Sequence, residues 1–348
     1  MIPVKGYAAF DASSPLKQYN FERRGLRSHD VLVDILFCGV CHSDIHQARD
    51  EWGGSIYPMV PGHEIVGKVI DVGAHVDKFK RGDTAGIGVM IDSCRQCKPC
   101  EIFMEQYCVE DMTGTYNNYE RDKVTLAQGG YSTQIVCDER YVYHIPNELD
   151  LAGVAPLLCA GITTYSPLKF ADVKRGDKVA VAGLGGLGHM AVKFAVAMGA
   201  EVTMLSTSPS KAQDARRLGA HHFVLSTDDS AMRKLNSRFD VVVDTVSADH
   251  NYESYLKLLG LEGKLLVVGL PKSDPLLNPF ELIKNRRSII GSMIGGTVET
   301  QAMLNFCGEE NIVADVEVIP MQQINEAYER MLKNDVKYRF VIDLSSLK

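Results

Sequence analysis

Cysteines crowd into one short stretch of the chain at the spacing of a metal site. Residues 94 to 108 read C-x-x-C-x-x-C-x7-C, formed by Cys94, Cys97, Cys100 and Cys108 in a polar loop. Four thiolates at this spacing can close a tetrahedron around Zn²⁺ and leave no open position, which is typical of a structural site. Iron–sulfur clusters use related spacings, but the sequence carries no other feature of a cluster protein. We therefore expect a structural zinc.

A second set of potential ligands is scattered along the chain. Cys41 lies in GVCHSDIH, His63 and Glu64 lie in PGHEIVG, and Cys159 lies in PLLCAGITTY. Two thiolates and one imidazole would leave a fourth position for water or substrate, as a catalytic zinc requires. Spacing alone does not group these residues.

A glycine motif points to a dinucleotide. Gly183, Gly185 and Gly188 form G-x-G-x-x-G, with Gly186 and Leu187 inside it, between the apolar run KVAVAG and the helix-like HMAVKFAVAMG. Such glycines allow a tight turn and let the backbone approach a pyrophosphate, which the helix N-terminus attracts. The alternative is a glycine-rich turn that serves packing only. The place of the motif in a strand–helix alternation favours dinucleotide binding.

The residues after the next apolar run favour NADP(H). A site that prefers NAD usually carries Asp or Glu about 20 residues after the motif, where it accepts from the ribose 2′-hydroxyl. Here that position is Ser206, followed by Thr207, Ser208 and Lys211. These groups can donate hydrogen bonds and charge to a 2′-phosphate. Ser208 could also cap the following helix, and the two roles are compatible.

The elements that must position these residues fall into two domains. From about Val31 to Val142, short apolar runs separated by Gly, Pro, Asp and His predict an irregular β-rich domain. From about Leu151, six apolar runs alternate with helix-like segments, which predicts a doubly wound parallel sheet. After Gly296 come two amphipathic helices and the strand FVIDL, which we assign to the first domain. We expect an α/β protein with domains 1–150 plus 297–348 and 151–296.

Composition narrows the functional classes. The 348 residues are 45% apolar, enough for two folded domains. A net charge of -7 offers no broad cationic surface for nucleic acid or anionic lipid, so we expect neither partner. The N-terminus lacks a signal-peptide pattern and the most apolar stretch, Val154 to Leu168, is too short to span a bilayer. We expect a cytoplasmic protein, whose nine cysteines are thiols or ligands.

The motifs together resemble a known family. GHEIVG, the four-cysteine motif and GLGGLGH, in this order, are similar to the zinc-dependent medium-chain dehydrogenases. CGVCHSDIH, LLCAGITTYSPL, GSMIGG and YRFVIDL resemble the cinnamyl alcohol dehydrogenase branch, over essentially the whole chain. The resemblance implies a GroES-like catalytic domain, a Rossmann domain with a six-stranded sheet and usually a homodimer. It also implies an oxidoreductase that passes hydride between NADP(H) and primary alcohols or aldehydes, aromatic or aliphatic.

The resemblance also implies roles for the scattered residues. Cys41, His63 and Cys159 would hold a catalytic zinc that acts as a Lewis acid, with Glu64 as an occasional ligand. Three further residues have implied roles: Ser43 and His46 would relay the proton, and Asp44 would orient the ring of His63. Ordinary hydrogen bonding at a helix start is the alternative for Ser43 and His46, and a plain acidic residue at a helix N-terminus is the alternative for Asp44.

The remaining implied contacts concern cofactor and substrate. For the cofactor they are Thr163, Val268, Gly269, Ser292, Ile294 and, at a phosphate, Arg339. For an apolar substrate pocket they are Trp52, Ile91, Met293 and Ile294, although Trp52 could equally be a core residue. Packing is the alternative throughout.

Two rival functions stay open. One is a zinc-independent reductase of the same fold, such as a quinone reductase, and both cysteine sets argue against it. The other is a non-catalytic zinc-binding scaffold or dinucleotide sensor. The presence of Ser43 and His46 beside all the implied ligands argues against that alternative.

Overall fold

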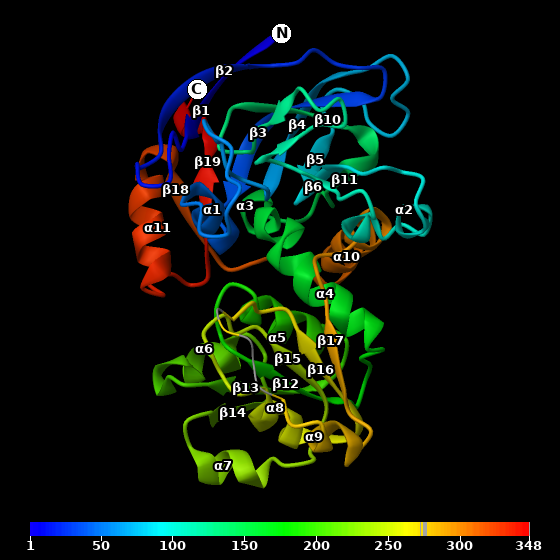
Figure 1. Ribbon diagram of the computed structural model, residues 1–348, viewed down its shortest axis with the longest axis vertical. Coiled ribbons are helices and arrows are strands. Elements are labelled where there is room, and N and C mark those ends of the chain that lie inside the picture. Colours follow the sequence, from blue (N-terminus) through cyan, green and yellow to red (C-terminus); the bar gives the residue numbers. More distant parts are fainter. Residues whose placement is uncertain (272, 274–276, 348) are drawn as a thin grey trace. The chain divides into compact units, whose positions relative to one another are not determined.

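The chain folds into two compact units. The structure is a computed structural model that describes residues 1–271, 273 and 277–347 (Figure 1). Unit 1 comprises Met1–Ile162 and Gly295–Lys348, and unit 2 comprises Thr163–Ile294. The chain passes from unit 1 to unit 2 within helix α4 (Ala160–Phe170).

Unit 1 is built around a mixed sheet of seven strands, counted over the described residues. Its path is β11 (Val142–His144), β5 (Thr84–Ile87), β4 (Ile65–Val72), β3 (Asp30–Gly39), β19 (Arg339–Asp343) and β18 (Val316–Pro320), and β10 (Gln134–Asp138) also pairs with β3. The central strands β3 and β4 are rich in Val and Ile, which suit a buried pleated surface. The prediction of a β-rich domain is confirmed.

The C-terminal segment returns to this sheet. The two predicted helices are α10 (Thr297–Glu310) and α11 (Ile324–Leu332), and the predicted strand is β19. In the sheet, β19 pairs antiparallel with β3, with Val341 opposite Gly39. β3 in turn pairs with β4, with Cys38 opposite Ile65. This pairing brings the chain around residue 339 close to the segment that precedes β4.

The division of the chain differs slightly from the boundaries expected at 150/151 and 296/297. Residues 151–162 lie with unit 1, because α3 (Leu151–Val154) and the short 3-10 helix η3 (Ala155–Leu158) pack against β3, β4 and β19. At the other end, unit 2 closes at Ile294.

Unit 2 is a doubly wound parallel sheet of six strands, as counted in the described part of the chain. The order is β14 (His222–Leu225), β13 (Glu201–Ser206), β12 (Lys178–Ala182), β15 (Phe239–Asp244), β16 (Leu259–Val267) and β17 (Ser288–Gly291). Each predicted apolar run forms one of these strands. The main helices between them are α5 (Gly188–Ala197), α6 (Ala212–Arg217), α7 (Asp229–Lys234) and α8 (Tyr252–Leu258). The strand order reverses at β12, where such sheets bind ligands at their carboxyl ends.

The most apolar segment belongs to unit 1 and the start of unit 2. No single helix in the described residues is long and apolar enough to cross a membrane. The bent pair Leu151–Leu158 and Ala160–Phe170 reaches the length and apolar composition of a membrane span only when both helices are taken together.

Three cysteines lie outside the two predicted ligand sets. Cys38, Cys137 and Cys307 are at most 1% exposed and are therefore buried as small hydrophobic residues are. All nine cysteines of the chain lie in the described residues, and none forms a disulfide.

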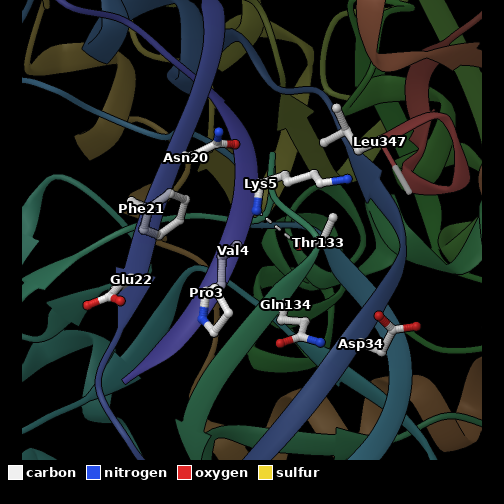
Figure 2. A pocket seen from close by; sticks show the side chains of 10 residues that line it. All are labelled: Pro3, Val4, Lys5, Asn20, Phe21, Glu22, Asp34, Thr133, Gln134 and Leu347. Carbon is white, nitrogen blue, oxygen red and sulfur yellow. Dashed lines mark hydrogen bonds between the residues drawn. The ribbon is translucent and has the colours of Figure 1, made fainter.

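Unit 1 also contains an open cavity of about 630 Å³ beside the N-terminal hairpin of β1 (Ile2–Ala8) and β2 (Lys17–Arg23). Figure 2 shows Val4, Lys5 and Phe21 of the hairpin at this cavity, together with Thr133 and Gln134. None of the residues that line it is a predicted site residue.

Candidate functional site

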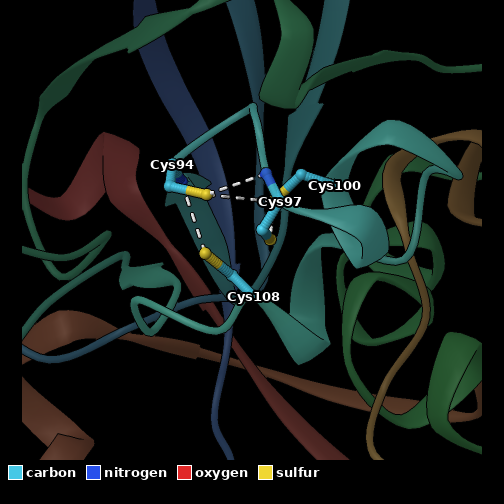
Figure 3. Close-up of side chains that lie close together, drawn as sticks. All are labelled: Cys94, Cys97, Cys100 and Cys108. Atoms are coloured by element: carbon cyan, nitrogen blue, oxygen red, sulfur yellow. Dashed lines mark hydrogen bonds between the residues drawn. The ribbon is translucent and has the colours of Figure 1, made fainter.

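The four clustered cysteines converge in unit 1. Cys97 precedes the short helix α2 (Lys98–Glu101), Cys100 lies in it, and Cys108 follows the 3-10 helix η1 (Glu105–Tyr107). Their sulfur atoms all lie within 4.8 Å of one another (Figure 3). The Sγ atom of Cys100 is 3.9 Å from that of Cys94 and 3.4 Å from that of Cys97. Four sulfurs at these separations suit a closed tetrahedral zinc site.

Backbone donors around this cluster favour the thiolate form that a metal needs. The N–H of Cys97 donates to Cys94 Sγ, and the N–H of Cys94 donates to Cys108 Sγ, both at 3.4 Å. Hydrogen bonds from the backbone of Val109 and Cys100 lower the pKa of the Cys97 thiol to about 6. Cys97 is therefore prepared to bind as a thiolate, whereas burial raises the pKa of the Cys100 thiol.

The scattered set converges at a second place in unit 1. Cys41 lies just before helix α1 (His42–Ala48), His63 and Glu64 precede β4, and Cys159 follows η3. All four side chains are buried and their potential ligand atoms lie within 4.8 Å of one another. The Sγ atoms of Cys41 and Cys159 are 3.9 Å apart, close to the separation of about 3.8 Å that a tetrahedron with Zn–S bonds of about 2.3 Å requires. The donor set of two thiols and one imidazole fits zinc.

Asp44 is the centre of the hydrogen bonds behind this set. Its carboxylate is fully buried and accepts from the backbone N–H of Cys41 at 2.9 Å and that of Gly62 at 3.1 Å. It also accepts from the hydroxyl of Tyr131 and faces Nδ1 of His63, each at 3.1 Å. Because a carboxylate only accepts, Nδ1 carries the proton and Nε2 is left to bind a metal.

Glu64 forms a buried ion pair beside the ligand set. Its Oε1 contacts the guanidinium of Arg339, while its Oε2 has no hydrogen-bond partner among the described residues. Burial raises the pKa of the Glu64 carboxyl to about 7, against the opposing charge of Arg339. Glu64 therefore lies within reach of the metal position with one oxygen unpaired.

Arg339 is the residue that the resemblance assigns to a phosphate contact. It is 4% exposed, begins strand β19 in unit 1 and pairs with Glu64. The pairing of β19 with β3, and of β3 with β4, brings it there. The guanidinium gives Glu64 a counter-ion, and its contact with a phosphate stays a prediction.

The residues expected to relay the proton lie on α1. Ser43 Oγ is 3.6 Å from Cys41 Sγ. Nδ1 of His46 is 2.6 Å from an oxygen of Glu51, and its ring lies 5.0 Å from that of Trp52. Glu51 cannot be recognised as the partner of His46 from the sequence, because a carboxylate five positions after a histidine forms no pattern. Trp52 is 52% exposed, so the alternative that it is a core residue is wrong.

In the glycine turn of unit 2, the structure favours glycine at each of the three motif positions for a different reason. Gly183 directly follows β12 and has φ at +89°, a conformation that favours glycine. A Cβ atom on Gly188 would lie 1.8 Å from the carbonyl oxygen of Gly183, whereas one on Gly185 would meet nothing within 4 Å. Gly186 and Leu187 complete the turn, and α5 begins at Gly188. The open space at Gly185 leaves room for a pyrophosphate to approach the backbone.

No carboxylate occupies the end of β13. Ser206 is buried there and its Oγ accepts from the N–H of Ser208 at 3.2 Å, while Thr207 is exposed. Ser208 occupies the N-cap position of a 3-10 turn, without a side-chain capping bond. Lys211 Nζ donates to the carbonyl oxygen of Leu184 in the glycine turn at 2.7 Å. The ammonium group is thereby held beside the turn.

The other residues suggested by resemblance are placed as follows. The N–H groups of Val268 and Gly269 donate to the carbonyl oxygen of Asp244, each at 3.0 Å, and the N–H of Ser292 donates to Val267 at 3.2 Å. Thr163 is 9% exposed.

Of the residues suggested for a substrate pocket, two lie in each unit. Ile294 ends unit 2 with φ at +39°, next to Met293, which is 45% exposed. Ile91 is buried in unit 1 and lines a depression with Asp92 and Cys94.

Comparisons with known proteins agree with this geometry. Residues 27–147 match the model described as the alcohol dehydrogenase GroES-like domain, and residues 186–309 match the model described as zinc-binding dehydrogenase. The chain is 51% identical over 349 residues to the NADP-dependent alcohol dehydrogenase C 1 of Mycolicibacterium smegmatis, with 100% of both chains covered. It is also 51% identical over 348 residues to the aldehyde reductase YahK of Escherichia coli, with 99% of each chain covered.

A solved structure gives the same result. The cinnamyl alcohol dehydrogenase of Sorghum bicolor superposes with a TM-score of 0.95 at 45% identity, covering 99% of this chain and 98% of that one. Identity of this size over whole chains shows family membership, and both metal-ligand sets and the glycine turn lie in the matched chain. The chain therefore belongs to the zinc-dependent medium-chain dehydrogenase/reductase superfamily, in its cinnamyl alcohol dehydrogenase family.

Proposed function

We propose that this protein is a zinc-dependent alcohol dehydrogenase/aldehyde reductase that transfers hydride between NADP(H) and primary alcohols or aldehydes. The observation that carries the proposal is the buried set of Cys41, His63 and Cys159, assembled from three distant segments of the chain. Bound zinc supplies a Lewis acid that draws charge from the substrate oxygen, and NADP(H) supplies or accepts the hydride. Relatives named as NADP-dependent alcohol dehydrogenase and aldehyde reductase support this activity.

The residues of unit 1 have distinct tasks in this proposal. Cys41, Cys159 and His63 hold the metal, and Asp44 fixes the ring of His63 so that Nε2 faces the ligand position. Glu64 is the occasional ligand, and its ion pair with Arg339 holds it beside the other ligands.

The proton travels separately from the hydride. Ser43 lies beside Cys41, and His46 stands one turn further along α1. His46 hydrogen-bonds to Glu51, which is partly exposed and connects the imidazole to solvent. We assign Ser43 and His46 to the proton path, and Glu51 as its outer end.

The two rival functions fit the site less well. A zinc-independent quinone reductase has no use for a buried pair of thiols and an oriented imidazole. A dinucleotide sensor has no use for a hydroxyl and an imidazole placed beside a catalytic ligand set. Loss of turnover when a chelator removes zinc would exclude the zinc-independent reductase. Measurable turnover would exclude the non-catalytic sensor.

The cofactor preference tests the proposal directly. With benzaldehyde, cinnamaldehyde and a short aliphatic aldehyde as substrates, kcat/KM should be at least about tenfold higher with NADPH than with NADH, because a lysine and hydroxyl groups replace the usual carboxylate. Lys211→Met should narrow this ratio mainly by lowering the value for NADPH, and its NADH kinetics are the internal control. A higher kcat/KM with NADH in the unaltered protein would contradict the preference.

Asp44 gives a test of the metal site that does not depend on turnover. Asp44→Asn should weaken zinc binding at the catalytic site by about 10- to 100-fold, because an amide nitrogen would face the donors that the carboxylate now accepts from. Titration with a chromophoric chelator measures this affinity, and the structural site provides the second, unchanged zinc equivalent. Tyr131→Phe, which removes one of these donors, is the milder comparison. Unchanged zinc affinity in Asp44→Asn would contradict the assigned role.

A homodimer in the cytoplasm is our proposal for the state of the protein in the cell. Family membership supports the dimer, and nine cysteines without a disulfide support a reducing compartment. Sedimentation of the purified protein at several concentrations measures the assembly state.

A further inference from the structure

A buried histidine and aspartate form a pair at the end of β15, in unit 2. Asp244 is the last residue of β15 and is fully buried, and His250 lies just before α8 with 13% of its side chain exposed. His250 Nε2 is 2.8 Å from Asp244 Oδ2, and its Nδ1 is 2.8 Å from the carbonyl oxygen of Ala248. Neither residue belongs to the cysteine sites or to the glycine motif.

The two hydrogen bonds determine how many protons the pair holds. The carbonyl oxygen of Ala248 can only accept, so Nδ1 of His250 must carry a proton. The short contact between Nε2 and Asp244 then requires one more proton, which either makes the ring an imidazolium or makes the carboxyl neutral. Burial raises the pKa of the Asp244 carboxyl, and the uncharged rings of Tyr252 and Tyr255 lie 5.1 and 5.3 Å from the ring of His250. The pair therefore holds this proton in common.

Asp244 connects several segments at the carboxyl edge of the sheet. Its Oδ1 accepts from the N–H of Val246 at 3.1 Å, while its carbonyl oxygen accepts from the N–H groups of Val268 and Gly269 at 3.0 Å. The bond from His250 closes the segment of residues 245–250 into a loop between β15 and α8. The carboxylate thus fixes both ends of this loop.

This loop packs against the glycine turn. The hydroxyl of Thr245 faces the carbonyl oxygens of Ala182 at 2.8 Å and of Gly183 at 3.1 Å. A Cβ atom on Gly183 would lie 3.0 Å from that hydroxyl oxygen, and one on Gly188 would lie 3.2 Å from it. A displacement of Thr245 would therefore change the shape of the turn.

We propose that His250 is a positioning residue for dinucleotide binding: the proton that it shares with Asp244 closes the 245–250 loop and holds Thr245 against the glycine turn. The proposal rests on the proposed function, in which this turn binds NADP(H). His250 does not touch the cofactor in this proposal and acts through Asp244 and Thr245.

Two substitutions by amide residues test the two hydrogen bonds of the His250 imidazole separately. In His250→Gln, the amide nitrogen can occupy the position of Nε2 and donate to Asp244. In His250→Asn, the shorter amide lies near the position of Nδ1 and can satisfy only Ala248. We expect NADPH to bind His250→Gln within about twofold of the unaltered protein, and His250→Asn about tenfold more weakly, since the latter leaves the buried Asp244 carboxyl without its hydrogen-bond partner.

The measurement is the Kd of NADPH from nicotinamide fluorescence on protein with two zinc ions per chain. The matched control is His222→Asn, because His222 pairs with Glu201 at 2.8 Å on the same sheet but is 58% exposed; its Kd should be unchanged. In His250→Asn, KM for NADPH should rise while kcat at saturation stays near the original value. Melting temperatures identify any variant that fails to fold.

The outcomes separate the inference from the proposed function. Equal NADPH affinity in His250→Asn and the unaltered protein would overturn the inference, and so would binding by His250→Gln as weak as that by His250→Asn. Failure of the unaltered protein to bind NADPH would instead contradict the proposed function.

Discussion

Replacement of Cys159 by alanine should abolish turnover while NADPH binding is preserved. The Sγ atom of Cys159 lies 3.9 Å from that of Cys41 in the buried ligand set, and its loss leaves one thiol, one imidazole and the Glu64 carboxylate, which is paired with Arg339. This remaining set should hold zinc poorly, and several kcal/mol of transition-state stabilisation are lost with the metal. We expect kcat to fall by on the order of 10³-fold or more. Since the glycine turn lies in unit 2 and Cys159 lies in unit 1, the Kd of NADPH should change by less than about twofold.

Three measurements on one preparation distinguish this result from a general loss of structure. Zinc analysis should fall from about two ions per chain to about one, while the melting temperature stays close to that of the unaltered protein. Cys137→Ala is the control, because Cys137 is also a buried cysteine of unit 1 but lies outside both ligand sets. A Cys159→Ala protein that retains its turnover would remove the basis of the enzymatic proposal.

The parts that local patterns predicted well are those in which neighbours in sequence are neighbours in space. The six apolar runs became β12 to β17, because strands that are covered on both faces need continuous apolar side chains. The four clustered cysteines met at one point, because a loop of 15 residues from Cys94 to Cys108 has few ways to separate them. The glycine motif ended one of these strands and opened α5.

The second ligand set could not be derived in this way. Cys41 and Cys159 are separated by 118 positions, and they meet only because η3 packs on the sheet of unit 1. No periodicity encodes such a contact, so the set was grouped by resemblance alone. Asp44 and Tyr131 illustrate the same limit, because their hydrogen bond joins residues that are 87 positions apart.

Arg339 shows a contact that the sequence does not reveal. The resemblance assigns this residue to a cofactor phosphate, and that role stays a prediction. The pairing of β19 with β3 also buries it beside Glu64, where a carboxylate requires a counter-ion. His250 cannot be recognised from the sequence for a similar reason, because SADHNYES shows a helix start and nothing of the carboxylate of Asp244.

Replacement of Cys97 by serine should lower the stability of the protein and leave the chemistry of the catalytic set intact, whereas Cys159→Ala should do the reverse. Serine is a poor zinc ligand, and the folding of such loops is coupled to metal binding, so the free energy of unfolding should fall by about 3 to 5 kcal/mol. The damage should extend beyond the loop, because Glu105 from this region accepts from the N–H and the hydroxyl of Thr297 at the start of α10, at 3.0 and 2.8 Å. Denaturant titration and soluble yield measure the loss.

The fraction of Cys97→Ser protein that folds should still turn over. Its catalytic set is intact, so kcat per catalytic zinc should stay within about threefold of the original value, whereas total zinc falls by one ion per chain. Glu105→Gln isolates the contribution of the link to α10: it keeps both zinc ions and removes the charge at the helix N-terminus, which should cost about 1 kcal/mol. If Cys97→Ser inactivates the remaining folded protein as completely as Cys159→Ala does, the two cysteine sets do not divide folding and catalysis between them.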